Sequence, residues 1–140
     1  MRTSRKSCLI ALLTALALPA TALAQAKADF GRGEYEANCA ACHGATGKGS
    51  GPIADLLKRS PTDLTTLQKR NGGIFPMARV YETIEGATVA EHGTRDMPIW
   101  GREYSIKAAE YYVDVPYNQE AFVRARILAL AEYLSRVQVK

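Results

Sequence analysis

The stretch Cys39-Ala40-Ala41-Cys42-His43 decides how this chain of 140 residues is to be interpreted. Residues three apart on a helical turn share one face, so the thiols of Cys39 and Cys42 point the same way. Two thiols placed like this can form thioethers with the two vinyl groups of one haem. His43 follows directly and can offer its imidazole nitrogen to the iron. The pattern is typical of covalent haem attachment, and it predicts one covalently bound haem c with His43 as an axial ligand.

A zinc site and a thiol redox pair are the weaker alternatives for the same residues. A structural zinc ion takes four protein ligands. Beyond residue 24 the only cysteines and histidines are Cys39, Cys42, His43 and His92. Cys42 and His43 are adjacent, and adjacent residues rarely bind one tetrahedral ion together. A thioredoxin-like pair requires a β-α-β setting, of which the sequence carries no sign.

The N-terminal 24 residues have the pattern of a secretory signal sequence. A basic start is followed by an almost wholly apolar run over residues 8–18 and then by small residues up to Ala24. The run is short for a membrane-spanning helix, which needs about 20 residues. We predict cleavage after Ala24, one mature domain over residues 25–140, a periplasmic location and no integral membrane segment in the mature protein. Export agrees with haem attachment, because c-type haems are attached outside the cytoplasm.

Removal of the signal sequence leaves a nearly neutral protein. Three of the 18 Lys and Arg residues, and none of the 14 Asp and Glu residues, lie in residues 1–24. The mature chain therefore has 15 basic and 14 acidic residues and a net charge of +1. This charge is too small to indicate a nucleic-acid partner.

The mature sequence predicts an all-α domain with long loops, because it contains helical periodicity and no alternating strand pattern. Asp29 can cap a first helix that runs to about Cys39, and the glycine-rich residues 46–52 form a loop. The strongest helix spans residues 119–137, where apolar residues recur at roughly helical spacing. Further predictions are a short helix capped by Thr62 or Asp63, a helix over 77–85 closed by Gly86, and a loop over 91–101.

Nearly the whole mature chain resembles the class I c-type cytochromes, in their bacterial single-haem branch. The shared motifs are Gly31-x-x-x-Tyr35-x-x-x-Cys39-x-x-Cys42-His43-Gly44, Gly47-Lys48-Gly49-x-Gly51-Pro52, Asn71-Gly72-Gly73-x-Phe75-Pro76, Met97-Pro98-x-Trp100-Gly101 and Tyr133-Leu134. The resemblance implies a cytochrome c-like fold of about four to five helices wrapped around one haem. It also implies that the terminal helices cross at Gly31, with Tyr35 and Tyr133 packed around the crossing. In the family a proline carbonyl accepts the second ring N–H of the axial histidine, and Pro52 is the matching position.

The sixth position on the iron has three candidate ligands. Met97 precedes Pro98, which biases its backbone toward an extended conformation, and it matches the ligand loop of the family. Met77 opens a predicted helix, so we expect it to pack inside the domain. His92 is the rival, because imidazole is a good iron ligand. We predict His43 and Met97 as the axial pair, with Trp100 covering one side of the haem near its propionates.

Histidine and methionine ligation closes the iron and indicates an electron carrier that is not itself an enzyme. The carrier is either free or the cytochrome subunit of an oxidoreductase. Its predicted partners are redox proteins, such as a periplasmic dehydrogenase, a terminal oxidase or another cytochrome. The alternatives are a peroxidase-like enzyme or a gas-binding sensor, both of which need an open sixth position. Spectra with added carbon monoxide or cyanide distinguish these classes.

The segment Arg102–Asn118 departs from the shortest family members, in which the last helix follows the ligand loop closely. It contains Tyr104, Tyr111, Tyr112 and Tyr117. Residues 107–112 can form at least one helical turn, and residues 113–116 are expected to be extended. Either the segment is a strap that buries its tyrosines over the haem or the helix crossing, or it is a docking surface for a partner.

Overall fold

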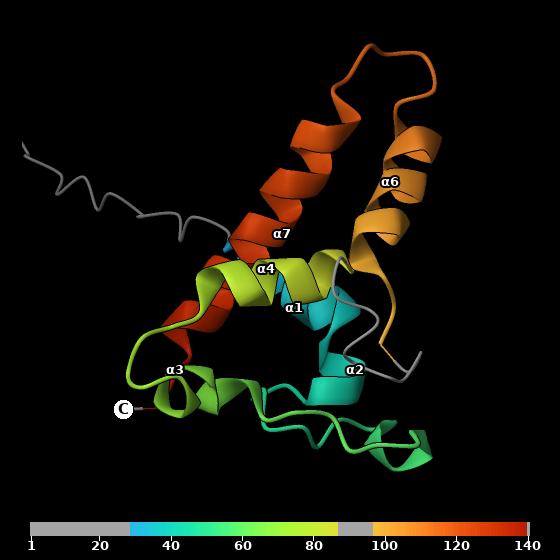
Figure 1. Cartoon of the computed structure of the whole chain (residues 1–140). Coiled ribbons are helices and arrows are strands. Elements are labelled where there is room, and N and C mark those ends of the chain that lie inside the picture. The colour runs from blue at the N-terminus through green and yellow to red at the C-terminus, as the bar shows by residue number, and fades with distance from the viewer. Residues whose placement is uncertain (1–28, 87–96, 140) are drawn as a thin grey trace, which may run out of the picture.

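The structure is a computed structural model, and it describes residues 29–86 and 97–139. In these two ranges the regular elements are all helices, and the predicted all-α class is confirmed (Figure 1). The elements are α1 (Phe30–Asn38), α2 (Ala40–His43), η1 (Ala54–Leu56), η2 (Leu64–Thr66), α3 (Leu67–Arg70), α4 (Met77–Glu85), α6 (Trp100–Tyr111) and α7 (Gln119–Arg136). The predicted signal sequence 1–24 and the candidate ligand His92 lie outside the described residues.

Side-chain caps fix several helix starts where the sequence placed them. The carboxylate of Asp29 accepts a hydrogen bond from the backbone N–H of Arg32 at 3.1 Å and caps α1. Asp63 accepts from the N–H of Thr65 at 2.8 Å and caps η2. Asn118 caps α7 in the same way. Such oxygens satisfy N–H groups that have no partner in the first turn of a helix.

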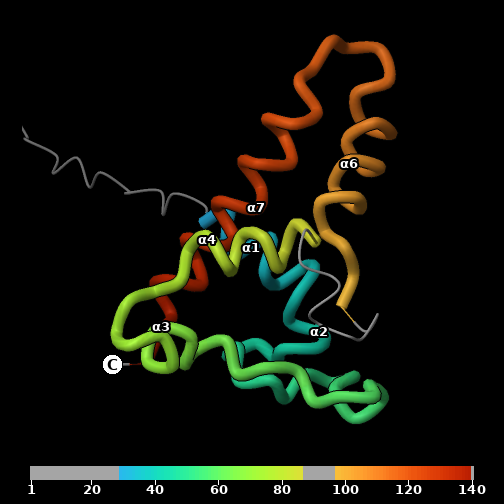
Figure 2. The backbone as a smooth tube through the Cα atoms, viewed as in Figure 1, coloured from blue at the N-terminus to red at the C-terminus, as the bar shows by residue number. Residues whose placement is uncertain are grey.

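α1 and α7 pack against each other (Figures 1 and 2). They come into close contact at Gly31. A Cβ atom at Gly31 would overlap the carbonyl oxygen of Ala129 and lie 2.8 Å from its carbonyl carbon. The rings of Tyr35 and Tyr133 pack beside this point with their centroids 5.3 Å apart. The predicted crossing of the terminal helices is therefore confirmed, and its closeness explains a glycine inside α1, where glycine costs about 1 kcal/mol relative to alanine.

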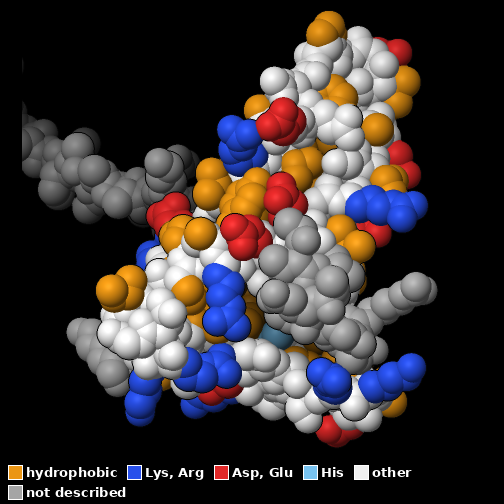
Figure 3. All heavy atoms as spheres, viewed as in Figure 1, with side chains coloured by type: hydrophobic (Ala, Val, Ile, Leu, Met, Phe, Trp, Pro, Cys, Tyr) orange, Lys and Arg blue, Asp and Glu red, His pale blue; other side chains and the backbone are white. Residues whose placement is uncertain are grey.

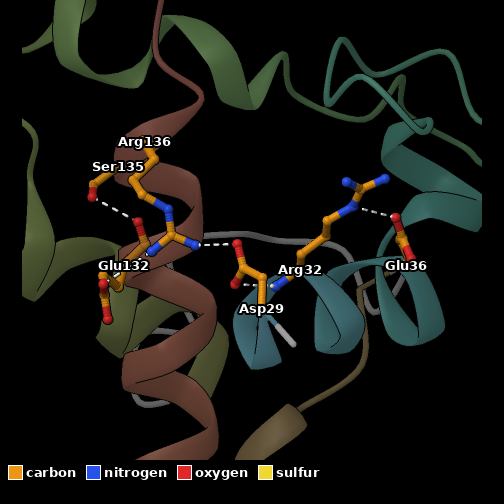
Figure 4. Close-up of polar contacts among 6 residues, drawn as sticks. All are labelled: Asp29, Arg32, Glu36, Glu132, Ser135 and Arg136. Atoms are coloured by element: carbon orange, nitrogen blue, oxygen red, sulfur yellow. Dashed lines mark hydrogen bonds and ion pairs between the residues drawn. The ribbon is translucent and has the colours of Figure 1, made fainter. Parts of the chain in front are cut away.

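One ion pair joins the start of α1 to the end of α7 (Figure 4). Arg136 contacts Asp29 across the two helices at 2.5 Å and Glu132 on its own helix at 2.9 Å. The N–H of Arg32 and the guanidinium of Arg136 lower the pKa of Asp29 below its ordinary value. These side chains are largely exposed, so each pair contributes little on its own.

The core lies between α7 and the three helices packed against it. Its buried residues are Tyr35, Cys39, Val80, Ile84, Tyr104, Ala108, Val123, Ile127, Leu130, Ala131 and Leu134. Five of them come from α7. Because one face of this helix is buried, its apolar residues recur at helical spacing, and the sequence predicted the helix from that pattern. α4 contributes Val80 and Ile84, one helical turn apart.

The helix α6 corrects two sequence predictions. Residues 91–101 were expected to be a loop, but the helix begins at Trp100. Residues 113–116 were expected to be extended, but residues 112–114 form a turn that follows α6 directly. The physical reason is that Trp100, Tyr104 and Ala108 lie four residues apart and form one face. Tyr104 and Ala108 are 1% and 0% exposed, so tertiary packing stabilises this helix.

A partly buried ion pair joins α1 to α7 beside α6. The carboxylate of Glu34, with its side chain 8% exposed, pairs with the guanidinium of Arg126. That guanidinium also lies over the rings of Phe30, Tyr104 and Phe122, at 5.3, 5.7 and 4.5 Å from their centroids. Burial and the adjacent Glu34 carboxylate raise the pKa of Tyr104 well above its ordinary value. The guanidinium of Arg126 therefore connects α1, α6 and α7 through its contacts with aromatic rings.

Replacing Arg126 by methionine is expected to lower the free energy of unfolding by about 2–3 kcal/mol, because it leaves the buried Glu34 carboxylate without its partner. Arg124→Met is the matched control on the same helix. Its partner Glu120 is exposed, with side chains 59% and 81% accessible, so a loss below about 0.5 kcal/mol is expected. Urea unfolding measures both variants. Equal losses would contradict the role given to the partly buried pair.

Candidate functional site

The Cys39–His43 stretch folds into the helical turn that the attachment chemistry needs. The carbonyl oxygen of Cys39 accepts from the N–H of Cys42 at 3.2 Å and from the N–H of His43 at 2.9 Å. Cys39 is buried, Cys42 is half-buried, and neither is in a disulfide. Burial, with a smaller effect of Glu34, raises the pKa of the Cys39 thiol to about 12. Both sulfurs are thus carried by one turn of the chain, next to His43.

The imidazole of His43 is oriented by a backbone carbonyl. Its Nδ1 lies 2.9 Å from the carbonyl oxygen of Thr62. When Nδ1–H donates this bond, Nε2 keeps its lone pair for a metal ion. Burial lowers the pKa of His43, although the contact with Thr62 acts in the opposite direction. The environment therefore favours the neutral imidazole, which is the form that binds iron.

Pro52 does not have the predicted role. The acceptor for His43 is Thr62, ten residues further along the chain, and Pro52 is exposed. Pro52 was predicted because it matches the position of the proline in the resemblance to class I cytochromes. The sequence held no signal for Thr62, because the contact is made by its main-chain carbonyl and not by its side chain.

The glycine-rich loop brings Thr62 to His43. Gly49 has a φ of +83°, and a Cβ atom there would overlap the carbonyl oxygen of Pro61. Only glycine adopts this conformation readily and also leaves room for the 61–62 segment to pack on the loop. The loop is fastened to the haem motif by bonds from the N–H of Gly49 to the oxygen of His43 at 2.8 Å and from the N–H of Gly51 to that of Cys42 at 3.0 Å. The loop therefore positions the orienting carbonyl.

Two neighbouring cavities, of about 320 and 230 Å³, open beside this turn. Both are lined by Cys39, His43, Thr62 and Met97, and Cys42 lines the smaller one. The larger is otherwise mostly apolar and includes Leu64, Leu67, Val80, Ile84, Leu130 and Leu134. We call the two cavities together the hollow. It brings together the two thiols, the imidazole and the methionine that the sequence analysis predicted as haem-binding groups.

Met97 lies in the wall of both cavities, whereas Met77 lies in neither. Met77 was expected to pack inside, but it is 40% exposed at the start of α4. Met97 is itself 39% exposed. Trp100 lines the smaller cavity and is half-buried, and its ring lies 5.8 Å from that of Tyr104.

A comparison with protein families identifies the fold and the chemistry. Residues 26–112 match the model of the family described as cytochrome c oxidase, cbb3-type, subunit III. The chain belongs to this family. The match includes α1 to α6 and every residue that lines the smaller cavity. No curated protein and no solved structure gives a significant match.

This cytochrome c family member is therefore an electron-transfer haem protein, and its cofactor is haem c with iron. The donor set in the described residues fits that group. Two thiols lie one helical turn apart, the imidazole has one nitrogen directed by a carbonyl, and a thioether lines the same hollow. A further cavity of about 600 Å³ lies between α4, α6 and α7, but it is lined by neither cysteine nor histidine.

Arginines at the cavities are the site residues that the sequence analysis missed. Arg70 and Arg79 line the larger cavity, and Arg59 lines the smaller one. Residues 48–79 contain six Lys and Arg against two Asp, and this concentration was the available signal. Figure 3 shows Lys and Arg side chains gathered over the lower part of the molecule, around these loops. The surroundings of the hollow are thus positively charged.

In the described ranges, no helix is long and apolar enough to cross a membrane.

Proposed function

We propose that this cytochrome carries single electrons in the periplasm, through one covalent haem c with His43 and Met97 as axial ligands. One observation supports this most: Cys39, His43 and Met97 line the same hollow, although Met97 is more than fifty residues away in the sequence. The family match supports electron transfer independently. When bound, the haem supplies a one-electron couple at its iron.

The residues of the chain have separate tasks in this proposal. Cys39 and Cys42 hold the cofactor as thioethers, and the carbonyl of Thr62 keeps the ring of His43 in one orientation. Met97 fills the sixth position and raises the reduction potential relative to harder ligands. Trp100, which lines the smaller cavity, covers one side of the haem. The apolar walls contributed by α4 and α7 exclude water from the cofactor and so limit reorganisation during transfer.

Arg59 and Arg79 are our candidates for pairing with the two haem propionates. Each lines one of the two cavities, and neither is in a salt bridge with another described residue. Arg70 is also present, but its guanidinium already donates to the carbonyl oxygen of Asp63 at 2.8 Å. A guanidinium is the preferred partner of a carboxylate, because it donates two parallel hydrogen bonds.

The proposed partners are other redox proteins, with a terminal oxidase suggested by the name of the family. Export to the periplasm is supported by the signal-like residues 1–24. The protein is then a free carrier or the cytochrome subunit of an oxidoreductase. Cell fractionation would place it, and recovery in the cytoplasm with the first 24 residues intact would contradict the periplasmic location.

Optical spectra with added ligands test the carrier function. The reduced wild-type protein is expected to show no change with carbon monoxide, and the oxidised protein none with millimolar cyanide, because both axial positions are filled. A redox titration should show one reversible one-electron transition. Rapid binding of carbon monoxide would instead indicate a sensor or an enzyme with an open site.

A further inference from the structure

α6 and the first half of α7 form an antiparallel hairpin that projects beyond the crossing of α1 and α7 (Figures 1 and 2). Its end, which we call the hairpin tip, consists of residues 111–117. A helix rises about 1.5 Å per residue, so the 12 residues of α6 place the tip about 18 Å from Trp100 at the cavity. The tip is therefore a surface distinct from the opening of the haem site.

The hairpin tip exposes apolar side chains that the fold does not use. Tyr111, Val113 and Val115 are 81%, 77% and 58% exposed, within five consecutive residues. Single apolar side chains on a surface are ordinary, but a contiguous group on a protruding turn indicates an interaction site. The hypothesis of a strap that buries its tyrosines thus holds for Tyr104 and is wrong for Tyr111.

Aromatic stacking supports the tip from beneath. The ring of Tyr112 lies 4.8 Å from Tyr111, 4.9 Å from Tyr117 and 5.6 Å from Phe122, measured between centroids. Tyr112 and Tyr117 are half-buried, so these contacts connect the turn to α7. A surface that is ordered in this way loses less conformational entropy on binding than a free loop.

The charge at the tip selects one kind of partner. Residues 108–119 contain the acidic Glu110 and Asp114 and no Lys or Arg. Glu120, further along, is paired with Arg124. Figure 3 shows acidic and apolar side chains at the end of the hairpin, while Lys and Arg lie lower on the hairpin and gather at the other end of the molecule. An anionic lipid surface would repel this rim. A protein with an apolar depression bordered by Lys and Arg complements it.

We propose that the hairpin tip is a docking surface for a redox partner protein that presents an apolar depression with a basic border. This rests on the proposed electron-transfer function and adds where the partner is held. The exposed side chains of Tyr111, Val113 and Val115 enter the depression, and Glu110 and Asp114 face its border. Electrons pass at the haem opening, so the tip determines affinity and leaves the redox couple unchanged.

The test uses the haem-loaded, full-length protein and respiratory membranes from the organism that encodes it. The tip variant combines Val113→Ser, Asp114→Lys and Val115→Ser, all at exposed positions, so the fold should persist. The expected result is a rise of about tenfold or more in KM for oxidation of the reduced protein, with kcat and reduction potential unchanged. Leu128→Ser, at a 45% exposed apolar site on α7, is the matched control and should change nothing.

A photo-reactive amino acid at Val113 gives a second readout that does not need electron transfer. It should cross-link to a membrane-associated redox protein, and the cross-link should be lost with Glu110→Lys and Asp114→Lys, whereas a probe at Leu128 should not form it. An unchanged KM together with no cross-link from Val113 would overturn the docking proposal. Binding of the wild type to vesicles of phosphatidylethanolamine and phosphatidylglycerol that is as strong as its binding to the respiratory membranes would also overturn the proposal. A cross-link only to a second copy of this chain would do the same. If the membranes do not oxidise the wild type but the cross-link to a redox protein forms, the proposal of a terminal oxidase as electron acceptor fails and the docking surface stands.

Discussion

Replacing Gly31 by valine is expected to prevent stable folding, with a loss of about 4 kcal/mol or more in the free energy of unfolding. A Cβ atom at this position would overlap the backbone carbonyl of Ala129, and a backbone atom cannot move aside as a side-chain end can. The two helices would have to separate, and the contact of Tyr35 with Tyr133 would open. Thermal unfolding and the yield of haem-loaded protein measure the effect.

Gly33 provides the matched control, two residues further along α1. A Cβ atom there meets nothing within 4 Å. Gly33→Ala should therefore stabilise the protein by about 0.5–1 kcal/mol, since alanine favours the helix over glycine. Tolerance of valine at Gly31 would mean that the helices do not cross as closely as described.

Replacing Met97 by alanine is expected to open the sixth position of the iron. The variant should bind carbon monoxide when reduced, and its reduction potential should fall because the thioether that favours the reduced state is lost. The oxidised protein should also lose the weak long-wavelength band of sulfur on ferric iron. Optical spectra and a redox titration of the purified variant measure these changes.

Met77→Leu is the control for Met97, because Met77 is exposed and lines neither cavity. It should keep the sulfur band and the potential of the wild type. A spectrum that changes with His92→Ala and not with Met97→Ala would identify His92 as the ligand and contradict the proposed axial pair.

The sequence predicted best where a local signal and the tertiary packing agree. Asp29 caps α1, Gly86 ends α4, and the apolar stripe of α7 faces the core. Gly31 was interpreted correctly because a glycine inside a helix needs a reason, and the resemblance to class I cytochromes offered one.

The sequence predictions were wrong or incomplete where contacts between distant parts of the chain determine the structure. α6 has no side-chain cap at Ile99 and contains Gly101, so local preferences indicated helix only at residues 107–112 and not the start at Trp100. Burial of Tyr104 and Ala108 stabilises it instead. Thr62 orients His43 through its main chain, which no side-chain pattern can reveal. The Glu34–Arg126 pair joins residues 92 positions apart, beyond the reach of any spacing rule.

The central claim is that Cys39 and Cys42 hold one haem covalently, and extraction with acidified organic solvent tests it most directly. We predict that the haem stays with the protein, and that intact mass spectrometry gives the chain from Gln25 to Lys140 plus one haem. The variant with both Cys39→Ala and Cys42→Ala should release any haem it binds. Quantitative transfer of haem from the wild-type protein into the solvent, with a mass equal to the bare chain, would contradict the account.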